Sequence, residues 1–306
     1  MPSSITHQIL AEKICEALSE NVKKRIANLP EYYLGAQGGD VLYFYNMTSR
    51  EKNFGKYFHR RNIYGVFCSF LRSVQKGDGR VCSYVAGYIA HYAADTVFHP
   101  YVYWLSEREK RRTGRKKDNF HARIESDLDT YFIQKHKGIK VAEYRFPLRY
   151  EELALSSVYQ ALSDAVAAGK GEPPLEKKPF LRAVKRYIRY QRLFLDPRER
   201  RRKAVYAAEK LLHVRHAFSF LFHRETFDER FLNAQGQEWF YPAAPKITSH
   251  DNADELFERA FREGVRLIEA FFAAADGDGE LNRGDFSKHF LARVAQEEMV
   301  RTEKGV

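Results

Sequence analysis

Residues 85–100, with the sequence VAGYIAHYAADTVFHP, set the architecture of this chain. Apolar and small side chains fill almost every position, and this pattern predicts a buried helix. Three polar exceptions, His91, Asp95 and His99, are spaced four residues apart, which places them along one helix face. Imidazole and carboxylate are the ligands that zinc takes in catalytic sites. Because buried polar groups need partners, we expect this face to bind a metal.

A second, shorter stripe follows in His121 and Glu125, again four residues apart. A single histidine on an apolar helix is usually a hydrogen-bonded core residue, and an isolated His–Glu pair at this spacing usually lies on a helix surface. The joint pattern favours a metal site over both alternatives. Because a residue before proline avoids helical backbone angles, we expect the first helix to end at His99, before Pro100. His99 would then face groups from another element, such as His121 and Glu125.

Length and composition are those of a folded protein. With 306 residues, 44% of them hydrophobic, the chain can bury a large core in one large domain or two modest ones. The three cysteines, Cys15, Cys68 and Cys82, are odd in number and lack metal-type spacing, which argues against a disulfide framework and against a thiolate metal site. No secretory signal and no membrane-spanning apolar run is present. We therefore expect a cytoplasmic protein.

The net charge of +11 is unevenly distributed. Residues 181–223 contain twelve Lys and Arg against three acids, and a second basic run covers residues 108–117. Such segments favour anionic partners, among them lipid headgroups, nucleic acid and phosphorylated substrates. The alternative is a solvated face of an ordinary amphipathic helix, because the basic residues alternate with apolar ones such as Val184 and Ile188.

Helical periodicity dominates the chain and predicts an all-α fold, a multi-helix bundle with a helical C-terminal extension. A segment rich in Gly, Pro and Lys at residues 169–179 predicts a boundary between a metal-binding helical domain (1–169) and a basic C-terminal region (170–306) packed on it. A short strand is expected over 141–148, and residues 29–53 are expected to be rich in loops. The expected helices cover 5–27, 57–74, 80–98, 119–134, 150–168, 181–222 with a break at Asp196-Pro197, 252–275 and 285–298.

Several motifs follow one another along the first 130 or so residues. They are Thr6-His7, Gly35-Ala36-Gln37-Gly38-Gly39-Asp40, His59, the run from Gly87-Tyr88-Ile89-Ala90-His91 through Asp95 to His99-Pro100, and His121-x3-Glu125. In order and spacing they resemble the zinc-dependent phospholipase C family, which shares a helical superfamily with single-strand-preferring zinc nucleases. The resemblance implies hydrolysis of a phosphodiester, and it is silent beyond Gly169.

The resemblance further implies a cluster of two or three zinc ions. Carried over by position, His91, His59 and Asp40 would hold one zinc, and Asp95 would bridge it to a second zinc that also takes His7. The third zinc would lie on His99, His121 and Glu125. Neighbouring zinc ions polarise a phosphodiester and make a bound water nucleophilic at neutral pH. Asp40 is also the candidate catalytic residue, since it could orient or deprotonate that water.

The substrate-binding positions depart from those of the choline-preferring members. Those members have aromatic residues where this chain has Val41 and Lys56, and a quaternary ammonium is best held by an aromatic cage. Tyr43 and Phe44 could supply aromatic rings from nearby, while Lys56 suits an anionic headgroup or a plain phosphate. We expect a phospholipid or a smaller phosphodiester as substrate, and contact with an anionic membrane surface.

Two other functions compete with this interpretation. A nuclease acting on single-stranded nucleic acid would belong to the same superfamily, and it predicts aromatic stacking platforms and strong salt dependence. A non-catalytic scaffold would instead keep one structural metal and bind an anionic surface. A catalytic cluster is inhibited by phosphate and stripped by chelators, whereas a closed structural site resists and unfolds when stripped.

Overall fold

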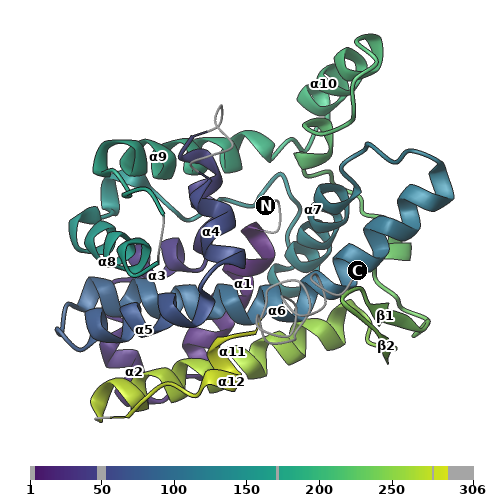
Figure 1. Cartoon of the computed structure of the whole chain (residues 1–306). Coiled ribbons are helices and arrows are strands. Elements are labelled where there is room, and N and C mark those ends of the chain that lie inside the picture. The colour runs from purple at the N-terminus through teal and green to yellow at the C-terminus, as the bar shows by residue number, and fades with distance from the viewer. Residues whose placement is uncertain (1–3, 47–52, 170–171, 278, 289–306) are drawn as a thin grey trace.

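The long helix α6 (Gly79–Thr113) runs through the middle of the molecule (Figure 1). The computed structural model describes residues 4–46, 53–169, 172–277 and 279–288. The side chain of Asp78 caps the start of α6 by accepting hydrogen bonds from the amides of Arg80 and Val81. The helix ends at Gly114, whose left-handed backbone (φ 68°) closes the last turn.

The predicted end of this helix at His99 is wrong. Pro100 lies inside α6, and the helix continues to Thr113. A proline within a helix costs about 3 kcal/mol, because it removes one hydrogen bond and crowds the preceding turn. Burial of the turns that follow offsets this cost: Tyr101 and Leu105 lie in the core, and the Tyr101 hydroxyl donates to the carbonyl of Phe231 at 3.1 Å. His99 is therefore held in mid-helix and not at a free terminus.

Among the helices that pack directly on α6 are α1 (Ser4–Ala17), α3 (Leu29–Gly35), α7 (Phe120–Phe132) and α11 (Ala253–Asp276). The crossing of α3 and α6 is very close. A side-chain carbon at Gly87 would lie 2.0 Å from the carbonyl oxygen of Tyr32, and one at Gly35 would lie 2.0 Å from that of Tyr84. Only glycine fits at these two positions, because any side chain would clash with the backbone of the other helix. The close crossing places the segment that follows α3 beside α6.

Residues 29–53, predicted to be rich in loops, include α3 and the 3₁₀ helix η1 (Gly38–Phe44). The predicted helix over 57–74 is divided into α4 (Phe54–Arg60) and α5 (Ile63–Val74), because Asn62 between them has a left-handed backbone (φ 47°). The predicted helix over 5–27 is likewise divided into α1 and α2 (Glu20–Arg25).

The predicted strand over 141–148 is wrong. The segment is irregular: its apolar side chains Val141, Tyr144 and Phe146 are buried, and no described residue forms a partner strand for it. The strands of the described residues are β1 (Trp239–Tyr241) and β2 (Ala244–Ser249), an antiparallel pair in which Trp239 faces Ser249. The pair rests on the second half of α6, where the Tyr101 and Trp239 rings lie 5.3 Å apart.

The remaining elements complete a helical bundle, so the predicted all-α fold is confirmed. The basic segment forms α9 (Lys177–Phe194) and α10 (Arg200–Leu211) with the expected break at Asp196-Pro197, although residues 212–222 lie outside both helices. Of the predicted last helix, the structure describes only its first residues, in α12, and the rest lies outside the described residues. The elements not yet given are η2 (Ile133–Lys137, a π-helix), η3 (Tyr150–Glu152), α8 (Leu155–Ala167), η4 (Ser219–Leu221), η5 (Glu229–Phe231) and α12 (Arg283–Phe286).

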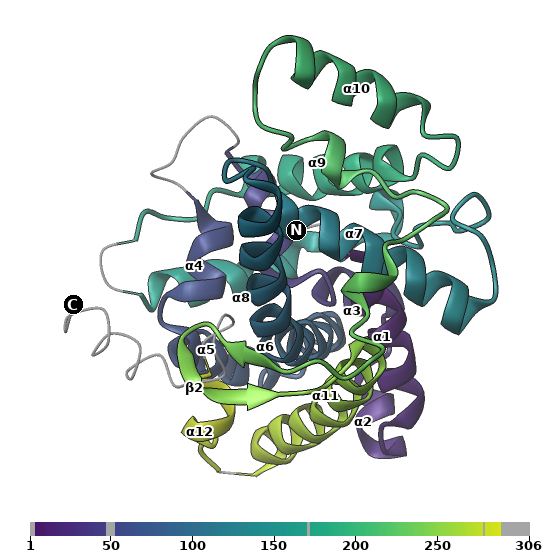
Figure 2. The same cartoon turned by 90° about the vertical axis from the view of Figure 1, so that its right-hand side faces the viewer.

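A continuous hydrophobic core joins both halves of the chain. It includes Ile89 of α6 together with Phe180 of α9 and Leu267 of α11. Within the described residues, every helix is too short or too polar to cross a membrane. The predicted division near residue 169 stays a prediction. Only α10 stands away from the body, at the edge of the molecule beyond α9 (Figure 2).

Candidate metal centre

The structure brings all eight predicted metal ligands to one place beside the middle of α6. They come from five elements: His7 of α1, Asp40 of η1, His59 of α4, His91, Asp95 and His99 of α6, and His121 and Glu125 of α7. Seven are buried, and His121 is partly exposed. Three groups of three have ligand atoms close enough to share a metal ion: His7, His91 and Asp95; Asp40, His59 and His91; and His99, His121 and Glu125.

Asp95 lies at the centre of these groups. One carboxylate oxygen, Oδ1, is 3.2 Å from Nε2 of His7 and 3.5 Å from Nε2 of His99. The other, Oδ2, is 3.3 Å from Nε2 of His91 and 3.5 Å from Nε2 of His59. A single carboxylate thus touches four imidazoles from three helices, and it joins the three groups into one cluster.

The group of Asp40, His59 and His91 depends on two glycines of η1. Oδ1 of Asp40 lies 3.3 Å from Nε2 of His59, and the Nε2 atoms of His59 and His91 are 3.3 Å apart. Gly38 has φ 51°, and a side-chain carbon there would lie 2.0 Å from the His91 ring. One at Gly39 would lie 2.7 Å from the His59 ring. The loop can approach both histidines only because these two residues have no side chain.

The group of His99, His121 and Glu125 forms the more open end of the cluster. Oε1 of Glu125 is 3.0 Å from Nε2 of His121 and 3.5 Å from Nε2 of His99. Side-chain exposure rises from 0% at His91 to 11% at His99 and 21% at His121. Solvent therefore reaches the cluster from the His121 end.

The electrostatics of the site leave its carboxylates ionised. Burial alone would raise the pKa of Asp95 and of Glu125, but the neighbouring imidazoles outweigh it and hold both pKa values well below the usual range. Burial lowers the pKa of His91 to about 3, so this imidazole is neutral and able to bind a metal. For His59, burial is outweighed by Asp40 and Asp95, which raise its pKa to about 10. The buried negative charge thus requires cations.

The donor set fits zinc. Two ligands at the usual zinc distances in a tetrahedral site are about 3.3 Å apart, and the neighbouring donor atoms here are separated by 3.0 to 3.5 Å. Oδ2 of Asp95 is fully buried and, among the described residues, makes no hydrogen bond of normal geometry, although two imidazole nitrogens lie beside it. Nδ1 of His59 instead lies 2.6 Å from the carbonyl of Gly55, a contact that directs Nε2 toward the cluster.

Asp129, which sequence reasoning missed, holds the start of α1 and so positions His7. The carboxylate of Asp129 accepts hydrogen bonds from the amide of Thr6 at 2.7 Å and from the hydroxyl of Thr6 at 2.6 Å. It also lies 2.9 Å from Nε2 of His223. A signal for Asp129 is present in the sequence, because it continues the four-residue stripe of His121 and Glu125 along α7.

The predicted substrate-binding residues occupy different environments. Lys56 is exposed on α4. The Tyr43 ring lies 5.6 Å from the His59 ring, and burial together with the charge of Asp40 raises the pKa of Tyr43. Phe44 is buried, and its ring contacts are with Tyr187 and Tyr190 of α9. Phe44 thus packs α9 against η1, and its substrate-binding role stays a prediction.

Tyr103 and Arg60 are further residues at the open end that the sequence analysis did not select. The Tyr103 ring lies 4.6 Å from the His121 ring and 5.8 Å from the His99 ring. Arg60 is exposed and hydrogen-bonds with Tyr103. Tyr103 follows His99 by four residues, so the face that carries the α6 ligands extends to it.

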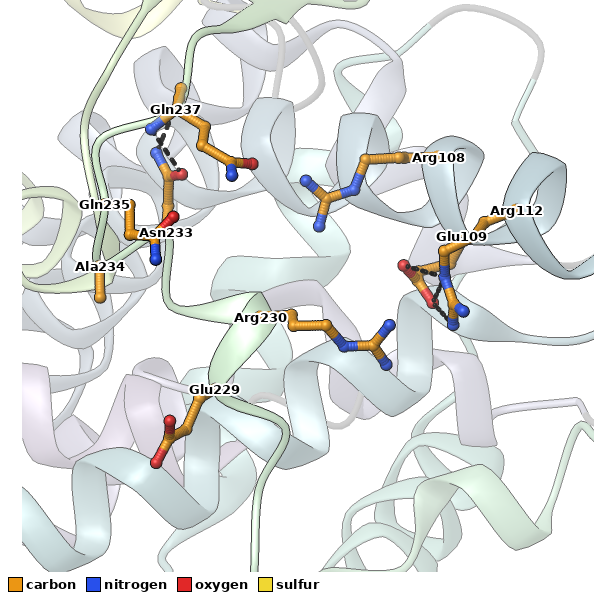
Figure 3. A pocket seen from close by; sticks show the side chains of 9 residues that line it. All are labelled: Arg108, Glu109, Arg112, Glu229, Arg230, Asn233, Ala234, Gln235 and Gln237. Carbon is orange, nitrogen blue, oxygen red and sulfur yellow. Dashed lines mark hydrogen bonds and ion pairs between the residues drawn. The ribbon is translucent and has the colours of Figure 1, made fainter.

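A separate cavity of about 430 Å³ lies farther along α6 (Figure 3). Arg108, Arg112 and Arg230 line it, but Arg112 is paired with the buried Glu109 and Arg230 with Asp228. Arg108 lies over the Trp104 ring. None of the eight candidate ligands lines this cavity, and it is not part of the metal centre.

Fold and side chains together define a class: all-helical proteins in which buried histidines and carboxylates from several helices form groups that could hold metal ions. The family model for zinc dependent phospholipase C matches residues 6–169, which is more than half of the chain. The chain belongs to this family, and the resemblance read from its motifs is confirmed. A search of the curated proteins and of the solved structures found no match to this chain.

Proposed function

We propose that this protein is a zinc-dependent phosphodiester hydrolase of the phospholipase C type, acting on a phospholipid or a smaller phosphodiester. The observation that carries the proposal is the position of Asp95, whose two oxygens lie 3.2 to 3.5 Å from four imidazole nitrogens. A structural zinc site is closed by four ligands from the protein. Eight donors around a bridging carboxylate, open at one end, are instead suited to two or three zinc ions and a substrate.

The proposed ligand roles follow the three groups. Asp40, His59 and His91 would hold one zinc, His7 with the bridging Asp95 a second, and His99, His121 and Glu125 a third. Bound zinc ions supply Lewis acidity toward phosphoryl oxygens and lower the pKa of water. Burial would raise the pKa of Asp40, but nearby positive charge, including that of His59, keeps it low. Asp40 is therefore ionised, and its carboxylate either binds metal or accepts a proton from water.

The open end of the cluster is the proposed entrance for the substrate. Tyr103 and Arg60 lie there beside His121, and Tyr43 lies beside His59. A guanidinium at this position would bind a non-bridging phosphate oxygen. Lys56 on α4 would attract an anionic headgroup from farther out.

Zinc content tests the metal part of this proposal. We expect two or three zinc ions per chain by elemental analysis, and fewer in the His91→Ala variant. His250→Ala is the matched control, since His250 is an exposed histidine far along the chain from the cluster. One zinc or none, unchanged by His91→Ala, would instead favour the metal-containing scaffold.

Substrate preference tests the reaction. We expect turnover of a water-soluble, short-chain phospholipid to exceed turnover of single-stranded DNA at equal enzyme concentration. The opposite order would show a single-strand nuclease of the same superfamily. Inorganic phosphate should inhibit the reaction, because the proposed metals retain open positions.

A cytoplasmic location is also part of this proposal. The free thiols of Cys15, Cys68 and Cys82 support it, since disulfides are characteristic of oxidising compartments. Labelling of the three thiols in protein from freshly lysed cells, without prior reduction, would test it.

A further inference from the structure

The segment that stands away from the body, residues 198–218, exposes four apolar side chains within its last eight positions. We call this segment the arm and its four apolar residues the tip. The exposed fractions are 78% for Leu211, 69% for Leu212, 51% for Val214 and 63% for Phe218. Four of the eight large hydrophobic residues that are exposed in the described part of the chain thus lie within eight positions. Such a concentration marks an interaction surface.

The tip is held in place by internal contacts of the arm. The carboxylate of Glu209 accepts hydrogen bonds from the amides of Ala217 at 3.0 Å and Phe218 at 2.8 Å, and from the hydroxyl of Ser219. The rings of Tyr206 and His216 stack at 4.3 Å. The chain after α10 is thereby folded back on the helix, and the four tip side chains remain exposed.

The arm is also strongly basic. Residues 198–218 contain seven Lys and Arg against two acids. Both acids are used inside the arm, Glu199 by Arg202 at 2.9 Å and Glu209 by the folded-back chain. Lys210 and Arg215, the chain neighbours of Leu211 and Val214, are exposed, and so is Lys203 two turns earlier on α10.

The base of the arm is attached next to the open end of the metal cluster. The amide of Asn119 donates to the carbonyl of His216 at 3.1 Å, and the amide of His216 donates to Asp118 at 3.2 Å. Asn119 caps α7, and the candidate ligand His121 is the second residue of that helix. A surface that bound the arm would therefore lie on the side from which solvent reaches His121.

Charge and apolarity together favour one occupant. A second copy of the chain would bring two basic arms together, and their charges would repel. Single-stranded nucleic acid is bound by aromatic stacking, whereas three of the four tip residues are aliphatic. Exposed apolar side chains next to exposed Lys and Arg match the boundary between headgroups and acyl chains of an anionic bilayer. We propose that the arm docks this protein on an anionic lipid bilayer with the tip inserted.

Vesicle binding tests this docking without reference to catalysis. Vesicles of phosphatidylcholine alone, or mixed with phosphatidylserine, are sedimented with the full chain. We expect binding to the mixed vesicles only, and weaker binding at high salt. The combined variant L211S/L212S/V214S/F218S should bind the mixed vesicles at least about tenfold more weakly, since each apolar side chain contributes to insertion. Ile247→Ser, at an exposed residue of β2, should bind like the unchanged protein.

Several outcomes would overturn the docking. They are equal binding of the tip variant, equal binding to neutral vesicles, a dimer that the tip variant abolishes, and competition by single-stranded DNA that does not depend on the tip. Circular dichroism and zinc content of the tip variant must match those of the unchanged protein; if they do not, the single change Leu211→Ser replaces it and should weaken binding in the same direction.

The benefit of docking to catalysis rests on the proposed function. We expect the tip variant to lose activity on vesicles and to keep activity on a soluble phosphodiester such as bis(p-nitrophenyl) phosphate. Vesicle binding without any hydrolysis would count against the proposed function and leave the docking intact. Hydrolysis of the soluble phosphodiester without vesicle binding would support the proposed function and count against the docking.

Discussion

Asp95 has a role at the residue scale that no other side chain of the cluster shares. Its oxygens are the points where donors from α1, α4 and α6 meet. Asparagine in its place keeps the shape but offers only one carbonyl oxygen. Its NH₂ group would face the imidazole nitrogens of the cluster and cannot bind a metal ion as a carboxylate oxygen does. The cluster therefore depends on the charge of this residue as well as on its size.

We predict that Asp95→Asn lowers both the zinc content and the phosphodiesterase activity, the activity by about 100-fold or more. Elemental analysis and turnover of a soluble phosphodiester measure the two effects. Asp164→Asn is the matched control, because Asp164 is half-exposed on α8 and its carboxylate is bound, among the described residues, by the surface side chains of Gln160 and Lys76. Full zinc content in Asp95→Asn would contradict the bridging role.

Asp40 allows the ligand role and the base role to be separated. We predict that Asp40→Asn reduces turnover by about 100-fold or more, since the variant can neither ionise nor accept a proton. If Asp40 is chiefly a ligand, the zinc content falls together with the activity. If it is chiefly a base, the zinc content stays and only the activity falls. Unchanged turnover would remove Asp40 from the site.

At the element scale, the close crossing of α3 and α6 positions the loop that carries Asp40. Glycines at both contact points let the backbones approach, and η1 then continues directly alongside His91. The stability of this crossing and the geometry of the metal centre are therefore linked through α3.

We predict that Gly87→Ala destabilises the protein by about 2–3 kcal/mol or more, because its new methyl group would overlap the carbonyl of Tyr32. Denaturant unfolding measures the change. Gly79→Ala, on the same helix, is the matched control, because its methyl group would have only an ordinary contact at 3.4 Å. We expect that substitution to be neutral or mildly stabilising. Equal effects of the two substitutions would show that the crossing is not tight.

At the scale of the whole molecule, α11 and α12 lie along one side of the bundle (Figure 1). Glu263 of α11 is bound by Arg266 at 3.0 Å and by Lys288, beyond α12, at 2.7 Å. Burial alone would raise the pKa of Glu263, but these two cations outweigh it and lower the pKa to about 2. The carboxylate thus links two segments that only the folded chain brings together.

This lowered pKa predicts a pH-dependent stability. An unfolded glutamate titrates near pH 4.5, so the contribution of Glu263 is complete above that pH and is lost as the pH falls toward 2. We expect Glu263→Gln to cost about 1–2 kcal/mol at pH 6, allowing for solvent screening, and progressively less below pH 4.5. Unfolding by urea at several pH values measures this. Glu258→Gln, at an exposed pair with Arg262, should show little change at any pH.

The helices and the candidate metal ligands of α6 and α7 could be proposed from local patterns. A helix repeats every 3.6 residues, so spacings of four align His91 with Asp95 and His121 with Glu125 whatever the rest of the chain does. Asp129 and Tyr103 extend the same stripes and were within reach of the same rule. The ligands His7, Asp40 and His59 have no such spacing, and the family resemblance alone supplied them.

Other features depend on contacts between distant segments and could not be read locally. Proline chemistry predicts a helix end at His99, but burial of the next turns carries α6 through Pro100. Periodicity permits a strand at 141–148, yet the part of the chain that the structure describes offers it no partner strand. The sequence alone therefore established the helices and their ligand stripes, because backbone geometry is local. Only the tertiary structure showed that five elements meet around Asp95 and that the chain after α10 folds back onto Glu209. Contacts between distant segments produce no periodic pattern in the sequence.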